Sequence, residues 1–140
     1  MSVLETPLIA VVDDDETVRE AVAELLYVLG VPCKCFDRAE AFLEAYIPGQ
    51  FAWLLTDVRM PGMGGLELLR RVKAMEPSMP VIVLTSYRDS LLEARALECG
   101  ATAYLTKPVA DCDIIDLLAS AIDHDLEHSP LDERGDSGNG

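Results

Sequence analysis

The sequence predicts an α/β fold, a doubly wound (βα)5 domain with a five-stranded parallel sheet in the order 2-1-3-4-5. The 140 residues suit one domain, because domains commonly hold roughly 100 to 150 residues. Short β-branched runs alternate with longer segments of helical periodicity. The apolar runs are continuous, which indicates strands covered on both faces. Right-handed crossovers would then place helices on both faces of the sheet.

The first unit pairs a buried strand with an amphipathic helix. Residues 8–12 form a continuous apolar run, as in a central parallel strand. In residues 17–29 apolar side chains recur every three or four positions, and Gly30 follows as a helix stop. The second unit has a strand at 32–36 and a helix at 39–46, which are followed by Pro and Gly.

The remaining units repeat the alternation. The third has a strand at 52–56, a Gly-rich loop and a helix at 66–75. The expected elements after it are a strand at 81–84, a helix at 89–99, a strand at 102–105 and a last helix from about Asp111, a plausible N-cap, to about residue 122. We therefore expect one domain over residues 1–125. We expect residues 126–140 to be an acidic disordered tail or the start of a linker, because this segment is too polar to order itself.

The composition excludes several classes of partner and compartment. The net charge of −14 repels nucleic acid and anionic lipid surfaces, so we expect no direct nucleic-acid or membrane binding by this chain. No apolar stretch approaches the roughly 20 residues that span a bilayer, and no secretory signal is evident, so a cytoplasmic protein is expected. Cys33, Cys35, Cys99 and Cys112 lack metal-site spacing and are expected to be reduced thiols packed in or near the core.

Polar side chains follow four of the five predicted strands. In chain order they are Asp13, Asp14, Asp15 and Glu16; Thr56 and Asp57; Thr85 and Ser86; and Thr106, Lys107 and Pro108. The first and third strands are neighbours in the expected order, so Asp13, Asp14 and Asp57 should converge at one edge of the sheet. Like charges in one pocket require a bound hard cation or a nearby ammonium, which Lys107 can supply.

This arrangement predicts a phosphoryl site. Carboxylates with a backbone carbonyl and waters suit Mg²⁺, which pairs naturally with a phosphoryl group. Asp57 would be the nucleophile and form an aspartyl phosphate. Lys107 would neutralise phosphoryl charge, and the Thr85 hydroxyl would donate a hydrogen bond to it.

A structural interpretation of the acidic run stays open. Four acids after an apolar run commonly form a solvated loop or favour a helix N-terminus, and we assign Asp15 and Glu16 to that role. The coincidence of acids, hydroxyl and ammonium at one sheet edge favours the phosphoryl site for the others. The spacing of His124 and His128 would allow them to chelate a metal, but we expect a solvated helix end favoured by the helix dipole instead.

At these residues the chain resembles the receiver domains of two-component response regulators, the CheY-like superfamily. The matching motifs are Val11-Val12-Asp13-Asp14-Asp15, Thr56-Asp57-Val58-Arg59-Met60-Pro61-Gly62-Met63-Gly64-Gly65, Val83-Leu84-Thr85-Ser86 and Lys107-Pro108. They cover residues 8 to about 125 and are most similar to receivers of the FixJ type.

The resemblance implies a role for each matching residue. Asp57 is the phosphoacceptor, while Asp13, Asp14, Asp57 and the Arg59 backbone carbonyl bind Mg²⁺. Lys107 contacts the phosphoryl group, and its bond to Pro108 is expected to be cis. Thr85 and Tyr104 form the switch, although Tyr104 could also be an ordinary half-exposed strand aromatic. Ser86, Tyr87 and Arg59 are modulators; the bulk of Arg59 and Tyr87 is expected to slow dephosphorylation, and Val109 replaces a commoner Phe beside the switch.

The resemblance also implies partners. A sensor histidine kinase or phosphotransfer protein would supply the phosphoryl group, and a downstream protein or output domain would bind the changed surface of the last two helices and last strand. That surface could also form a phosphorylation-dependent homodimer, or be simply solvated. Two alternatives stay open: the receiver part of a FixJ-like transcription factor whose output domain is absent, and a small phosphatase of the haloacid-dehalogenase type.

Overall fold

The computed structural model describes residues 8–86, 89–107 and 115–116. Contacts divide the chain into two units, Met1–Pro108 and Val109–Gly140. In the second unit Ile115 and Asp116 are described, and both are helical. The rest of the expected last helix, its cap Asp111, Cys112 and the tail lie outside the described residues.

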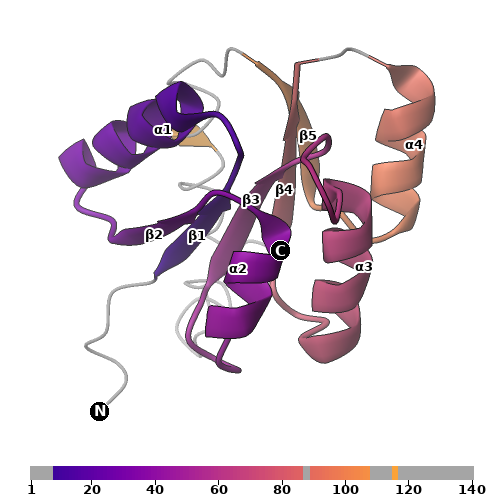
Figure 1. The fold of residues 1–140 in the computed structure, drawn as a ribbon, viewed down its shortest axis with the longest axis horizontal. Coiled ribbons are helices and arrows are strands. Elements are labelled where there is room, and N and C mark those ends of the chain that lie inside the picture. Colours follow the sequence, from indigo (N-terminus) through magenta and orange to yellow (C-terminus); the bar gives the residue numbers. More distant parts are fainter. Residues whose placement is uncertain (1–7, 87–88, 108–114, 117–140) are drawn as a thin grey trace, which may run out of the picture. The chain divides into compact units, whose positions relative to one another are not determined.

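The first unit contains one five-stranded sheet in the order β2-β1-β3-β4-β5, which confirms the predicted topology (Figure 1). All four strand pairs are parallel. The strands are β1 (Ile9–Val12), β2 (Cys33–Phe36), β3 (Trp53–Asp57), β4 (Val81–Thr85) and β5 (Ala103–Thr106). The three central strands are buried along their whole length, whereas the edge strands β2 and β5 are partly exposed.

The described helices are α1 (Glu16–Val28), α2 (Ala39–Ala45), α3 (Gly65–Met75) and α4 (Ser90–Glu98). The first and last of these begin after an Asp cap. The Asp15 side chain accepts a hydrogen bond from the Thr17 N–H, and that of Asp89 accepts from two N–H groups of the first turn of α4. These caps satisfy backbone donors that have no partner within the helix. Within the described part of the chain, no helix is long and apolar enough to cross a membrane.

Strand register brings the candidate residues to the same edge of the sheet. Val12 pairs with Thr56, so the residues that follow them, Asp13 and Asp57, are neighbours. Thr85 pairs with Thr106, and the Lys107 N–H donates to the Thr85 carbonyl at 2.7 Å. Because the strands are parallel, their carboxyl ends share one edge.

An aromatic cluster anchors α2 to the sheet below this edge. Phe42 of α2 is fully buried and packs edge-on against Phe36 of β2, with ring centroids 5.5 Å apart. Phe51 lies 5.3 Å from Phe42 and Tyr46 lies 5.9 Å from it. Such pairs add to the stabilisation from burial itself. The position of α2 therefore depends strongly on Phe42.

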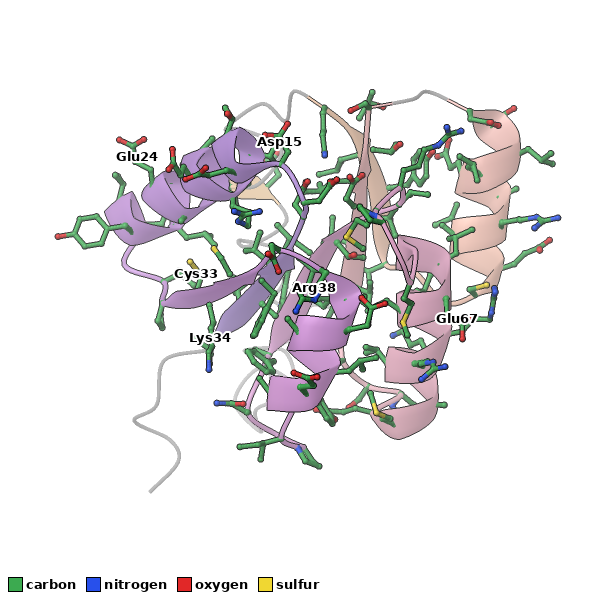
Figure 2. All side chains as sticks on the ribbon, viewed as in Figure 1. Asp15, Glu24, Cys33, Lys34, Arg38 and Glu67 are labelled. Atoms are coloured by element: carbon green, nitrogen blue, oxygen red, sulfur yellow. The ribbon has the colours of Figure 1, made fainter. Side chains whose placement is uncertain are left out.

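The expectation that the cysteines pack in or near the core is wrong for Cys35, which is exposed, while Cys33 and Cys99 are half-buried. Cys33 and Cys35 do lie on one face of β2, as their spacing predicts. That face is only partly covered because β2 is an edge strand; Figure 2 shows Cys33 and Lys34 on opposite sides of it. The three described thiols are free. Burial, and then the neighbouring Cys35, raises the pKa of Cys33 to about 11, so this thiol stays protonated at neutral pH.

We predict that Phe42→Ala lowers the free energy of unfolding by about 3–5 kcal/mol, because it removes a large side chain and leaves a cavity among three aromatic rings. Denaturant unfolding of both proteins measures the difference. Glu44→Ala, an exposed change on the same helix, is the matched control and should shift stability by less than about 0.5 kcal/mol. Equal stability of the two variants would contradict the packing described here.

Candidate functional site

Three carboxylates converge at the carboxyl ends of β1 and β3. Asp13, Asp14 and Asp57 each bring an oxygen to within 4.8 Å of the other two. Asp13 is completely buried and Asp57 is 6% exposed, whereas Asp14 lies open to solvent. The site therefore has two desolvated carboxylates with a third at its rim, as the strand-end pattern predicts.

The acidic run after β1 divides into residues with different roles. Asp15 caps α1, and its N–H donates to Asp13 Oδ1 at 2.9 Å. Figure 2 shows Asp15 at the start of α1, beside the strand ends. Arg19, one turn into α1, donates from Nη1 to the Asp13 carbonyl at 2.7 Å. The helix thus fixes the backbone of Asp13 while Asp14 is left at the surface.

Lys107 bridges the two buried carboxylates from the end of β5. Its Nζ lies 2.7 Å from Asp13 Oδ2 and 3.3 Å from Asp57 Oδ2, and its side chain is 11% exposed. Burial by itself lowers the pKa of Lys107, but the hydrogen bond and charge of Asp13, together with Asp57, outweigh it and leave the pKa raised. The side chain is therefore a positively charged ammonium at neutral pH.

The ionised form of Asp57 is disfavoured by its surroundings. Burial, followed by the charge of Asp13, raises its pKa, although Lys107 and the Val58 N–H act in the opposite direction. The Val58 N–H donates to Asp57 Oδ1 at 2.8 Å. Negative charge on Asp57 is thus incompletely compensated by the protein, which favours binding of a cation at this point.

The donor set fits a hard divalent cation. All three acids offer carboxylate oxygens, the ligand type that Mg²⁺ prefers. Beyond the ion pair with Lys107, Asp13 Oδ2 has no hydrogen-bond partner within the described part of the chain. A buried carboxylate oxygen with unused acceptor capacity is chemically suited to a metal or to a metal-bound water.

Thr85 ends β4 one residue after Leu84, which pairs with Asp57, and Tyr104 lies on the neighbouring strand β5. Thr85 is completely buried, and Tyr104 is half-buried against the hydrophobic core. Burial raises the pKa of Tyr104, while its hydrogen bond with Thr85 acts to lower it. The two residues of the expected switch are therefore in contact.

Only some of the other residues predicted to belong to the site are among the described residues. Ser86 and Arg59 are exposed, at the ends of β4 and β3 respectively. Tyr87 and Pro108 lie outside the described residues, as does Val109.

The sequence pattern indicates a Gly-rich loop before α3 but not how tightly it closes on Asp57. A Cβ atom on Gly65 would lie only 2.0 Å from the Asp57 carbonyl oxygen. The Gly65 N–H donates to the Val58 carbonyl at 2.8 Å. Gly65 therefore allows the start of α3 to pass directly over the backbone of Asp57, which no side chain would permit.

Sequence reasoning missed Glu40. This residue of α2 is half-buried, and its Oε2 accepts a hydrogen bond from the Met63 N–H at 2.9 Å. Met63 belongs to the loop between β3 and α3. Nothing in the helical periodicity of α2 signals such a contact, because it depends on where the loop lies in the folded chain.

We predict that Asp57→Asn raises the free energy of unfolding at pH 7 in the presence of a chelator. A raised native pKa means that folding favours the protonated acid; this stabilisation is complete below the unfolded pKa of about 3.9 and is lost as pH rises through the native value. The neutral amide avoids the cost of the buried charge. Denaturant unfolding of both proteins at pH 7 with excess EDTA measures the difference in the free energy of unfolding.

The exposed change Asp37→Asn serves as the control and should leave stability within about 0.5 kcal/mol of the parent. An Asp57→Asn protein less stable than the parent would contradict the repulsion inferred between Asp13 and Asp57.

Comparisons with known proteins place this site in a family. Residues 9–119 match the model of the response regulator receiver domain. The transcriptional regulatory protein FixJ of Bradyrhizobium diazoefficiens is 40% identical over 115 residues, which are 81% of this chain and 56% of that protein. The DNA-binding transcriptional regulator NtrC of Escherichia coli is 36% identical over 121 residues, 86% of this chain and 26% of that protein.

Solved structures of receiver domains have the same fold as this chain. A CheY-like receiver domain protein from Methanospirillum hungatei JF-1 has a TM-score of 0.82 at 26% identity, covering 89% of this chain and all (100%) of that one. The BeF3-activated receiver domain of DrrB has a TM-score of 0.74 at 32% identity, with coverage of 89% and 100%. This chain spans about half of the FixJ length, at 56%. It belongs to the response regulator receiver domain family.

Proposed function

We propose that this receiver domain accepts a phosphoryl group on Asp57 from the phosphohistidine of a sensor histidine kinase or phosphotransfer protein. The observation that carries the proposal is the Asp57 carboxylate, buried beside Asp13 and 3.3 Å from the Lys107 ammonium. An Asp57 oxygen forms a bond to phosphorus as the P–N bond of the donor breaks, and the electron pair of that bond stays on the imidazole. The product is an aspartyl phosphate.

The surrounding groups stabilise the charge of the transferred group. Asp13, Asp14, Asp57 and the Arg59 backbone carbonyl are proposed to hold Mg²⁺, which when bound neutralises phosphoryl oxygens. Lys107 supplies a second positive charge from within the protein. The Thr85 hydroxyl is buried at the end of β4, beside this pocket, and is proposed to donate to a phosphoryl oxygen. Each of these groups stabilises the negative charge that is spread over the oxygens of the phosphoryl group during its transfer.

The same contacts suggest how the phosphorylated state is transmitted. If Thr85 turns toward the phosphoryl group, its hydrogen bond with Tyr104 is exchanged for a new one. Tyr104 can then repack, and this changes the surface of α4 and β5 on which a partner binds. Ser86, Tyr87 and Pro108 are proposed to modulate this change.

The proposed domain covers residues 1–125, with 126–140 as a tail or the start of a linker. The matching regulators extend well beyond this chain, since it covers 56% of FixJ. We therefore propose that a downstream protein or an output domain outside these residues carries the response, as in a FixJ-like transcription factor. We further propose that the protein is cytoplasmic and that this chain does not itself bind nucleic acid or membrane. Phosphorylation would also allow it to form a homodimer.

We predict that acetyl phosphate with Mg²⁺ adds one phosphoryl group to the parent chain and none to Asp57→Asn, because only a carboxylate can form the acyl phosphate. Intact-mass spectrometry measures the adduct. Omission of Mg²⁺ should abolish it in the parent. Asp37→Asn is the matched control and should be modified as the parent is. A parent chain that stays unmodified with Mg²⁺ present would refute the proposal, and sustained turnover of p-nitrophenyl phosphate would favour the phosphatase alternative.

We predict that Arg59→Ala shortens the lifetime of the aspartyl phosphate several-fold. Arg59 is exposed two residues after Asp57, and its long side chain is proposed to obstruct the approach of water to the phosphoryl group. Phosphorylated protein freed of acetyl phosphate is followed by intact mass over time. Arg71→Ala, an exposed change on α3 that removes only an ion pair with Glu67, is the control. An unchanged or longer lifetime in Arg59→Ala would show that this side chain does not obstruct hydrolysis.

A further inference from the structure

We propose that Glu40 is a positioning residue that holds the loop between β3 and α3 in the geometry needed to bind the metal. The inference rests on the proposed function, because the loop carries the Arg59 carbonyl assigned to the metal. Glu40 itself lies on α2, and within the described residues its side chain accepts its hydrogen bond from the loop backbone at Met63. Its effect would pass through the backbone of the loop.

The loop begins and ends at one fixed point. Asp57 and Val58 precede it, and Gly65 returns to them through the hydrogen bond from its N–H to the Val58 carbonyl at 2.8 Å. Gly64 is also close, since a Cβ there would lie 3.2 Å from the Val58 carbonyl. The base of the loop is therefore closed tightly, and its tip needs a separate anchor to keep a defined position.

Glu40 supplies that anchor from outside the loop. Its Oε2 accepts the Met63 N–H at 2.9 Å, and a Cβ added to Gly62 would lie only 2.7 Å from the same oxygen. Gly62 has φ +78°, a conformation that favours glycine. The turn at Gly62 thus brings the loop backbone directly onto the Glu40 carboxylate.

The charge of Glu40 strengthens this contact. Hydrogen bonds to a carboxylate are roughly twice as strong as those between neutral groups. The Met63 N–H is the largest cause of the lowered pKa of Glu40, so the residue is ionised at neutral pH. Glu40 also lies in the first turn of α2, where the helix dipole favours an anion. Its other oxygen, Oε1, is buried without a hydrogen-bond partner within the described residues, so the contact with the loop retains a desolvation cost.

The position of α2 is in turn fixed by the aromatic cluster. Phe42, two residues after Glu40, is fully buried between Phe36 and Phe51. A helix held this firmly gives the carboxylate a fixed location. The geometry thus connects the aromatic core to the metal site through one side chain and one backbone N–H.

The test compares Glu40→Ala and Glu40→Gln with Glu44→Ala, an exposed glutamate one turn along the same helix. Titration calorimetry measures Mg²⁺ affinity of the unphosphorylated chain, and hydrogen exchange measures protection of the Met63 N–H. We expect Glu40→Ala to weaken Mg²⁺ binding about tenfold, as for other residues that orient metal ligands, and to speed exchange at Met63. Glu40→Gln, which retains an acceptor, should fall between parent and Ala, and Glu44→Ala should match the parent.

Phosphorylation kinetics give a second readout. The Mg²⁺ concentration for half-maximal modification by acetyl phosphate should rise in Glu40→Ala, while the rate at saturating Mg²⁺ stays near that of the parent. A purely structural defect would lower the saturating rate and the unfolding midpoint together. If Glu40→Ala does not fold, Glu40→Gln carries the same comparison.

Gly62→Ala provides a second check, because its new methyl group displaces the Glu40 carboxylate, while the strain of an alanine at φ +78° is the same with or without Glu40. It should weaken Mg²⁺ binding in the parent and have a smaller effect in Glu40→Ala, whereas additive effects would contradict the proposal. Mg²⁺ affinity and Met63 exchange that are equal in Glu40→Ala and Glu44→Ala would overturn the inference and leave the proposed function intact. Failure of the parent itself to bind Mg²⁺ would instead overturn the proposed function.

Discussion

The structure depends on how two buried negative charges are kept close together. Asp13 and Asp57 are both desolvated, and Coulomb repulsion between them would oppose folding if they stood alone. Lys107 offsets that repulsion through its two ion pairs, at 2.7 and 3.3 Å. The offset is incomplete, since the pKa of Asp57 remains raised. The negative charge of the carboxylates therefore exceeds the positive charge of Lys107, and this excess favours the binding of a cation.

The sheet register makes this charge cluster possible without long loops. Adjacent residues of β1 and β3 are paired up to Val12 and Thr56, so the two acids leave the sheet side by side. Gly65 then lets α3 begin over the backbone of Asp57, and α1 fixes Asp13 through Arg19. Helix ends and strand ends thus meet at one edge, and errors in any one element would displace a ligand of the cluster.

The convergence of Asp13, Asp57 and Lys107 could be predicted because parallel topology alone brings strand ends together. The limits of the described helices and strands differ from expectation by one residue at most, in part because caps such as Asp89 count outside the helix. The exposure of Cys35 was not predicted, because the sequence does not say how much of an edge strand a helix covers. The roles of Gly65 and Glu40 were missed for a related reason: both depend on distances between segments that only the folded chain sets.

At Lys107, the backbone hydrogen bond that pairs the strands and the side-chain charge that acts in the site can be changed separately. Its backbone N–H joins β5 to β4 at the Thr85 carbonyl, while its side chain reaches across to β1 and β3. Any replacement other than proline retains the backbone bond and alters only the reach or charge of the side chain. A series of substitutions at this one position, from arginine to methionine to alanine, can therefore vary the electrostatic potential of the pocket in steps while the strand pairing stays constant.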